Sequence, residues 1–184
     1  MQAGLVLVFA STLMLMGTIE PELDNASFLI AMGVLGVGMG LVVSQLGNVV
    51  QSAVGDEERS EAGGLQYTAQ QLGSSLGTAL LGAIVITGLI AAFTTNIASD
   101  PDINARVEQQ VEVQLSAGGS FVSSSQVREA AEAARVPPKA TDALVDHYED
   151  AQLKALKLAF LVAAFLVLAS FWSTRRLPAA RLTT

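Results

Sequence analysis

The stretch ASFLIAMGVLGVGMGLVVSQLGNVVQSAV, residues 26–54, contains no charged side chain. A helix needs about 20 predominantly apolar residues to cross the hydrocarbon core of a bilayer, within a range of about 17–25. This stretch exceeds that length, and so does a second uncharged run at residues 62–99. Two shorter uncharged runs, at residues 3–19 and 158–173, lie at the lower limit. The pattern predicts an all-α integral membrane protein with four transmembrane helices.

The composition supports a membrane protein and argues against an enzyme. The 184 residues are 51% hydrophobic and 15% charged, whereas a soluble domain carries about 25% charged residues. There is no cysteine, and His147 is the sole histidine, so we expect neither a disulfide framework nor a metal site. No nucleophile, base and orienting group occur together at membrane depth. We therefore expect no enzymatic activity, no cofactor and no nucleic-acid partner.

Breaks between the uncharged runs set the expected bounds of the helices. Pro21 stops a helix, and Asn25 or Ser27 can cap the next one, so the first two helices should form an antiparallel hairpin. The third helix is expected to begin after Gly63 and Gly64. The predicted parts are three transmembrane helices within residues 1–94 (about 4–19, 27–52 and 65–94), a helical segment at 95–152, a last transmembrane helix at 153–173 and a tail at 174–184.

The segment at residues 95–152 is rich in charged, Ser, Gln and Ala residues. Glycines at 118–119 and prolines at 137–138 divide it into about three short helices. Its last helix, from about Thr141, should run without a break into the last transmembrane helix. Apolar residues recur in the segment at helical spacing, at Ile103, Val107, Val111, Leu115, Ala143, Leu144 and Tyr148. We expect a small folded helical insert.

The orientation follows from the rule that short cytoplasmic flanks are rich in Lys and Arg. The tail carries Arg175, Arg176 and Arg181 and no acidic residue, so it is expected in the cytoplasm. An even number of crossings then places both ends in the cytoplasm and the insert at residues 95–152 outside. The predicted location is the cell membrane, as a multi-pass protein.

Two predicted transmembrane helices carry closely spaced glycines. Glycine lets helix backbones approach closely in a membrane, and we interpret these residues as helix-packing positions. A nucleotide-binding glycine loop is the alternative, but no preceding strand and no phosphate-binding Lys accompany the glycines. The proposed packing glycines are Gly36, Gly38 and Gly40 in the second helix, and Gly73, Gly77 and Gly82 in the third.

Uncharged polar residues gather in the expected cytoplasmic halves of the same two helices. Polar groups at membrane depth must find partners or face a water-filled cavity. They either join the helices by hydrogen bonds or form a gate or polar lining of a transport path. The candidates are Ser44, Gln45, Asn48, Gln51, Gln66, Gln70 and Gln71. No ionisable residue lies deep in a predicted span, so the chain offers no proton-coupling group.

Four segments in the middle of the chain resemble the major facilitator superfamily, in its fourteen-helix drug:proton antiporter branch. They are GVGMGL (36–41), SQLGNVVQ (44–51), EERSEAGGLQ (57–66) and TAQQLGSSLGTALLG (68–82). The resemblance implies that the four helices are the last four of that fold. It also implies that the proton-coupling acids lie in earlier helices, and that substrate binds between two helix bundles.

Two functions remain open from the sequence. The first is a C-terminal fragment of a proton-coupled exporter of drugs or small amphipathic molecules, inactive in transport by itself. Its partners would be the lipid bilayer, the remaining helices of the transporter, the small-molecule substrate and protons. The second is a small self-standing membrane protein whose extracytoplasmic helical cap binds a partner, as a sensor or an assembly subunit.

Overall fold

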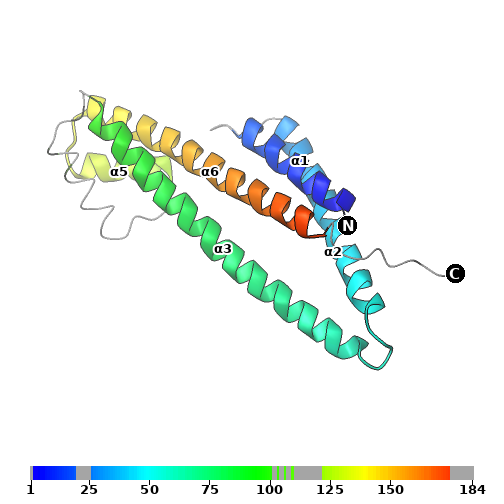
Figure 1. The fold of residues 1–184 in the computed structure, drawn as a ribbon. Coiled ribbons are helices and arrows are strands. Elements are labelled where there is room, and N and C mark those ends of the chain that lie inside the picture. Colours follow the sequence, from blue (N-terminus) through cyan, green and yellow to red (C-terminus); the bar gives the residue numbers. More distant parts are fainter. Residues whose placement is uncertain are drawn as a thin grey trace. The chain divides into compact units, whose positions relative to one another are not determined.

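The computed structural model describes residues 2–19, 26–100, 103, 106, 109 and 122–174. Within these residues the protein is all-α (Figure 1). The described helices are α1 (Gln2–Thr18), α2 (Ala26–Ser52), α3 (Arg59–Ala98), α5 (Ser124–Ala133) and α6 (Pro138–Thr174). The predicted turn at 20–25, the tail from 175, and Val107, Val111, Leu115 and the glycines at 118–119 lie outside the described residues.

Three of the helices, α2, α3 and α6, are long and apolar enough to cross a membrane. The chain is therefore a multi-pass membrane protein. The apolar helix α1 has 17 residues, and at 1.5 Å per residue it is about 25 Å long, against about 30 Å of hydrocarbon. Four transmembrane helices are thus not established, and α1 as a fourth span stays a prediction.

Helix α3 begins at Arg59, before the expected start after Gly63 and Gly64, so that expectation was wrong. Just before α3 begins, the Glu58 amide donates a hydrogen bond of 3.1 Å to the Gly55 carbonyl and closes a turn. An ion pair of 2.8 Å joins Arg59 to Asp56. Gly63 and Gly64 therefore lie inside α3, although each glycine in a helix costs about 1 kcal/mol relative to Ala.

The long helices α3 and α6 have 40 and 37 residues. At 1.5 Å per residue they are about 60 and 55 Å long, roughly twice the hydrocarbon thickness of a bilayer. Helix α6 runs without a break from Pro138 to Thr174, which confirms that the last insert helix continues into the last span. Both helices must therefore extend well beyond the hydrocarbon.

The chain divides into two compact units. Unit 1 contains residues up to Leu81 and from Phe160, and therefore holds α1, α2 and one part each of α3 and α6. The second unit, Gly82–Ala159, is called the cap unit below. It contains α5 and the remaining parts of α3 and α6.

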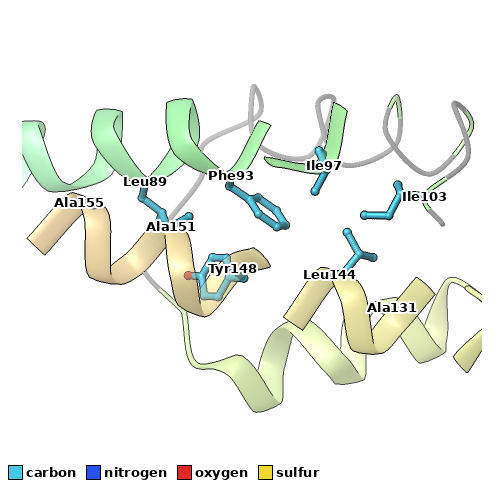
Figure 2. Packing of buried hydrophobic residues seen from close by; sticks show 9 residues of the cluster. All are labelled: Leu89, Phe93, Ile97, Ile103, Ala131, Leu144, Tyr148, Ala151 and Ala155. Atoms are coloured by element: carbon cyan, nitrogen blue, oxygen red, sulfur yellow. The ribbon is translucent and has the colours of Figure 1, made fainter. Parts of the chain in front are cut away.

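The cap unit has a hydrophobic core of its own (Figure 2). The rings of Phe93 and Tyr148 meet edge to face, with centroids 5.4 Å apart and an angle of 84° between their planes. The core consists of Leu89, Phe93 and Ile97 of α3, Ile103, Ala131 of α5, and Leu144, Tyr148, Ala151 and Ala155 of α6. Ile103, Leu144 and Tyr148, expected as apolar positions at helical spacing, are buried in this core.

In unit 1, α1 and α2 pack as an antiparallel hairpin, as predicted. A Cβ added to Gly38 would lie 2.9 Å from the Val8 amide nitrogen and 3.1 Å from the Leu7 Cβ. A Cβ added to Gly4 would lie 2.9 Å from the Val42 Cγ2 and 3.1 Å from the Gly38 carbonyl oxygen. The two helices approach this closely because glycine occupies both positions.

The other proposed packing glycines lie elsewhere on the helices. A Cβ added at any of them meets no other side chain or helix within 4 Å in the described part of the chain. They are Gly36, Gly40, Gly73, Gly77 and Gly82. Their packing against helices of a larger protein stays a prediction.

The close approach at Gly38 predicts a specific sensitivity to a single methyl group. Gly38→Ala should lower the free energy of unfolding by about 1–3 kcal/mol, because the added Cβ overlaps backbone of α1. Gly40→Ala is the matched control, since its Cβ meets no such atom within 4 Å and Ala favours a helix by up to about 1 kcal/mol. Chemical denaturation in detergent micelles measures both. Equal stability of the two variants would contradict the packing.

Candidate functional site

The candidate transport-path residues lie on α2 and α3 in unit 1. Those on α2 are all exposed, whereas Gln66 and Gln70 on α3 are half-buried and Gln71 is exposed. Ser44, Asn48 and Gln51 follow one another at intervals of four and three residues, so they share one face of α2. We call the seven residues Ser44, Gln45, Asn48, Gln51, Gln66, Gln70 and Gln71 the polar set.

Within the described residues, no side-chain hydrogen bond joins members of the polar set. Several hydroxyl groups elsewhere on these helices donate to a carbonyl of their own helix. Thr68, for example, donates to the Gly64 carbonyl at 2.9 Å and Ser52 donates to the Val49 carbonyl at 3.1 Å. The amide side chains of the set are therefore available to a substrate, water or another helix, and their roles in transport stay predictions.

The cap unit is closed by a polar clamp on one residue, Val122. The Val122 amide donates to the Tyr148 hydroxyl at 3.0 Å, and this hydroxyl lies 3.0 Å from the Val122 carbonyl oxygen. The same carbonyl accepts a bond of 3.0 Å from Gln152 Nε2. Tyr148 and Gln152 lie four residues apart on α6, so both reach the same segment. The clamp fastens the chain before α5 to α6.

Helix α5 is capped at both ends. At its start Ser123 and Gln126 form a capping box, in which each side chain accepts from the backbone amide of the other residue. At its end the amide of Val136 donates to the Ala131 carbonyl and that of Arg135 to the Glu132 carbonyl. Arg135 has a positive φ of 57°, so these bonds form a Schellman motif. Such caps define where this short helix begins and ends.

Polar contacts also join α3 to α6 at the end of the core. His147 Nε2 lies 2.6 Å from Asp100 Oδ2, and Asn96 contacts both Asp150 and Lys154 at 3.4 Å. The Lys154 ammonium, 2.8 Å from the Asp150 carboxylate, lowers the pKa of Asp150. Because a lowered carboxyl pKa favours the charged form, this contact is present at neutral pH and weakens as the pH falls through that pKa.

Neither site holds the residue pattern of a metal centre. Among the described residues, no group of three or more His, Cys, Asp or Glu side chains is placed to hold a metal ion. The described residues hold uncharged polar groups on the long apolar helices of unit 1 and a separate hydrophobic core in the cap unit.

Comparison with known proteins points to transport. The chain is 29% identical over 111 residues to a protein described as "Probable actinorhodin transporter" from Streptomyces coelicolor. The match covers 59% of this chain and 19% of that protein, so the chain spans about a fifth of the length of the relative. No protein-family model matches the chain, and no solved structure matches it.

Sequence reasoning missed several residues that organise these regions. The capping box was visible as a Ser, two intervening residues and a Gln before an Ala-rich run. The clamp was not visible, because Tyr148 was assigned only to an apolar face. Gly4 and Gly88 carried no signal of close approach, since their contacts depend on which helix lies opposite. A Cβ added to Gly88 would lie 3.6 Å from the Cα and the Cβ of Ala155.

The clamp predicts different effects for the two tyrosines of the chain. Tyr148→Phe leaves the Val122 amide without its acceptor, which should destabilise residues 122–133 by about 1–3 kcal/mol. Tyr67→Phe is the control, because the Tyr67 side chain is 64% exposed. Amide hydrogen exchange in micelles should show about fivefold to a hundredfold less protection of this segment in Tyr148→Phe only. Equal protection in both variants would refute the clamp.

Proposed function

We propose that the chain is the C-terminal part of a membrane transporter that exports drugs or other small amphipathic molecules in exchange for protons. The partial match to the probable actinorhodin transporter carries this proposal. The three apolar helices support it, since they are long enough to cross a membrane. The resemblance to the major facilitator superfamily supplies the finer assignment, including the location in the last helices of the fold.

The polar set would line or gate the transport path. Its side chains are amides and one hydroxyl, which form hydrogen bonds but do not change charge at ordinary pH. They can therefore select a substrate by hydrogen bonding and shape, whereas proton binding needs an ionisable group. The uncharged runs at residues 26–54 and 62–99 contain no such group. The groups that bind the proton would lie in other helices of the complete protein.

A second function rests on the cap unit. Its own core and the caps at both ends of α5 would allow it to bind a partner as part of a small self-standing membrane protein. In that case residues 1–184 would act without further helices, and no transport would accompany them. Transport by the complete protein would favour the first function over the second.

The test uses the complete protein in proteoliposomes with a pH gradient and a fluorescent cationic substrate. We expect accumulation that a protonophore abolishes. Asn48→Ala should change the turnover rate or the substrate preference while proton dependence remains, because only hydrogen bonding in the path changes. Ser170→Ala is the control, since its hydroxyl donates to the Leu166 carbonyl of its own helix at 2.9 Å.

The same assay on residues 1–184 alone should show no proton-driven accumulation. Such accumulation would contradict the account of a fragment without a coupling group. If the complete protein transports nothing, the second function is favoured. If Asn48→Ala abolishes proton dependence, the role of the polar set as an uncharged path is wrong.

A further inference from the structure

The uncharged run on α3 is longer than a bilayer requires, so the sequence leaves open which part of it lies in the membrane. Residues 62–98 of α3 carry no charge, and at 1.5 Å per residue they are about 55 Å long, against about 30 Å of hydrocarbon. Hydropathy alone allows a span at either end of this run or anywhere between. The neighbouring helix α6 removes the choice, because its charged residues show where the hydrocarbon ends.

Contacts within the cap unit determine which residues of α3 and α6 share a level, meaning a position along the helix pair. A Cβ added to Gly88 would lie 3.6 Å from the Cα and the Cβ of Ala155. Farther into the cap unit, the Asn96 amide contacts Asp150 Oδ2 and Lys154 Nζ, each at 3.4 Å. Residue numbers rise along α3 as they fall along α6, so the two helices are antiparallel. Residues two before Gly88 therefore share a level with residues two or three after Ala155.

Charged side chains on α6 place the cap end of this pair outside the hydrocarbon. Lys154 and Asp150 form an ion pair, and their side chains are 55% and 56% exposed. Lys157 is exposed as well and follows within one turn. A charged side chain inside the bilayer is costly, and from Leu158 to Thr174 helix α6 contains none. The hydrocarbon therefore begins just after Lys157 on α6, and at the corresponding level on α3.

The exposure of large apolar side chains changes at this same level on both helices. On α3 the exposed ones lie between Leu65 and Ile86, which is 40% exposed. Leu89 and Phe93, farther into the cap unit, are 3% and 4% exposed and lie on the side of α3 that faces α6 (Figure 2). On α6 the exposed ones begin with Leu158, at 45%. A band of exposed large apolar side chains is unfavourable in water and suits lipid. The two helices thus give the same boundary.

We propose that the bilayer surface on the side of the cap unit crosses the helix pair at Ile86 and Leu158. Residues 87–98 of α3 then lie in water although they are uncharged, and their apolar side chains form the cap core instead of facing lipid. The lipid-facing surface is the exposed apolar band that continues from Ile86 and Leu158 away from the cap unit. The third span accordingly ends about one helical turn or two before residue 94, where hydropathy places its end.

The proposed level also gives depths along α3 for part of the polar set. At 1.5 Å per residue, Gln70 and Gln66 lie about 24 and 30 Å along α3 from Ile86, close to the opposite surface of a hydrocarbon of about 30 Å. This consequence rests on the proposed transport function: Gln66 and Gln70 would belong to a gate at the far mouth of the path rather than to a lining at its centre. The level itself does not depend on transport.

Spin labels on single cysteines measure the level in the complete protein in lipid vesicles. Leu80→Cys and Ala91→Cys replace exposed residues that lie about three turns apart on one face of α3. Residues 1–184 contain no cysteine, and any elsewhere would be replaced. Collisions with oxygen, which concentrates in lipid, and with a water-soluble nickel chelate report the depth of each label. Labels at Leu161→Cys and Asp146→Cys, both exposed, calibrate lipid and water.

We expect the label at residue 80 about 9 Å inside the level of Ile86 and the label at residue 91 about 7 Å outside it. A label at residue 91 that collides mainly with oxygen would overturn the proposal, because the hydrocarbon would then extend to the end that hydropathy favours. A label there that neither probe reaches would also overturn it, since this face would not be in water. Vesicles without transport would refute the proposed function, while the label depths would still decide the level.

A charge placed at the same two positions tests the level without a probe. Leu80→Lys should lower the yield of folded protein by about tenfold or more, because it puts an ammonium group in hydrocarbon. Ala91→Lys should retain at least about half of the yield, because an exposed position in water tolerates a charged side chain. Size-exclusion chromatography after extraction in mild detergent measures both yields. Equal losses in the two variants, or equal tolerance of them, would overturn the proposed boundary.

Discussion

The packing of Phe93 and its neighbours against Tyr148 is the interaction on which the described arrangement of α3 and α6 depends. At about 60 and 55 Å, α3 and α6 exceed the roughly 30 Å of a bilayer's hydrocarbon. A shared core buries their facing apolar side chains, and removing such surface from water is favourable. Helix α5 and the clamp on Val122 then complete the core from the side. Ala151 and Ala155 belong to the same core, and their small side chains let α3 and α6 approach closely there.

The two units of the chain are stabilised by different kinds of contact. In hydrocarbon every backbone group must be paired within the chain, which long helices achieve by themselves. Hydroxyls such as those of Ser11 and Thr12 are buried in unit 1 and donate to the Val8 carbonyl at 2.8 and 2.7 Å. Close approach there depends on shape, as at Gly4 and Gly38. The cap unit instead has a buried apolar core, helix caps and polar contacts such as that of His147 with Asp100. One pair of helices, α3 and α6, contributes to both units.

The sequence alone predicted the features that depend on local pattern. Uncharged runs revealed α2, α3 and α6, and the spacing of Leu144 and Tyr148 revealed a helix that continues into a span. It could not reveal contacts that depend on which helix lies opposite. Gly77 was expected as a packing glycine, yet a Cβ on Gly77 meets no neighbour within 4 Å in the described part of the chain, whereas one on Gly88 would lie 3.6 Å from Ala155. The start of α3 was placed too late because Gly63 and Gly64 were read as the end of a loop. The turn closed by the bond from the Glu58 amide to the Gly55 carbonyl, which precedes the helix, was not recognised. The polar set could be located but not given a role, since no side-chain hydrogen bond joins its members within the described residues.

We propose that α3 crosses the membrane once and that its two ends lie on opposite sides, with the cap unit outside. Single cysteines at Ser60 and Ser125, both exposed, test it most directly in intact cells of the host. The account predicts that a membrane-impermeant thiol reagent labels Ser125→Cys in whole cells and labels Ser60→Cys only after lysis. Labelling of Ser125→Cys only after lysis would contradict the orientation, and labelling of both cysteines in whole cells would contradict the crossing itself.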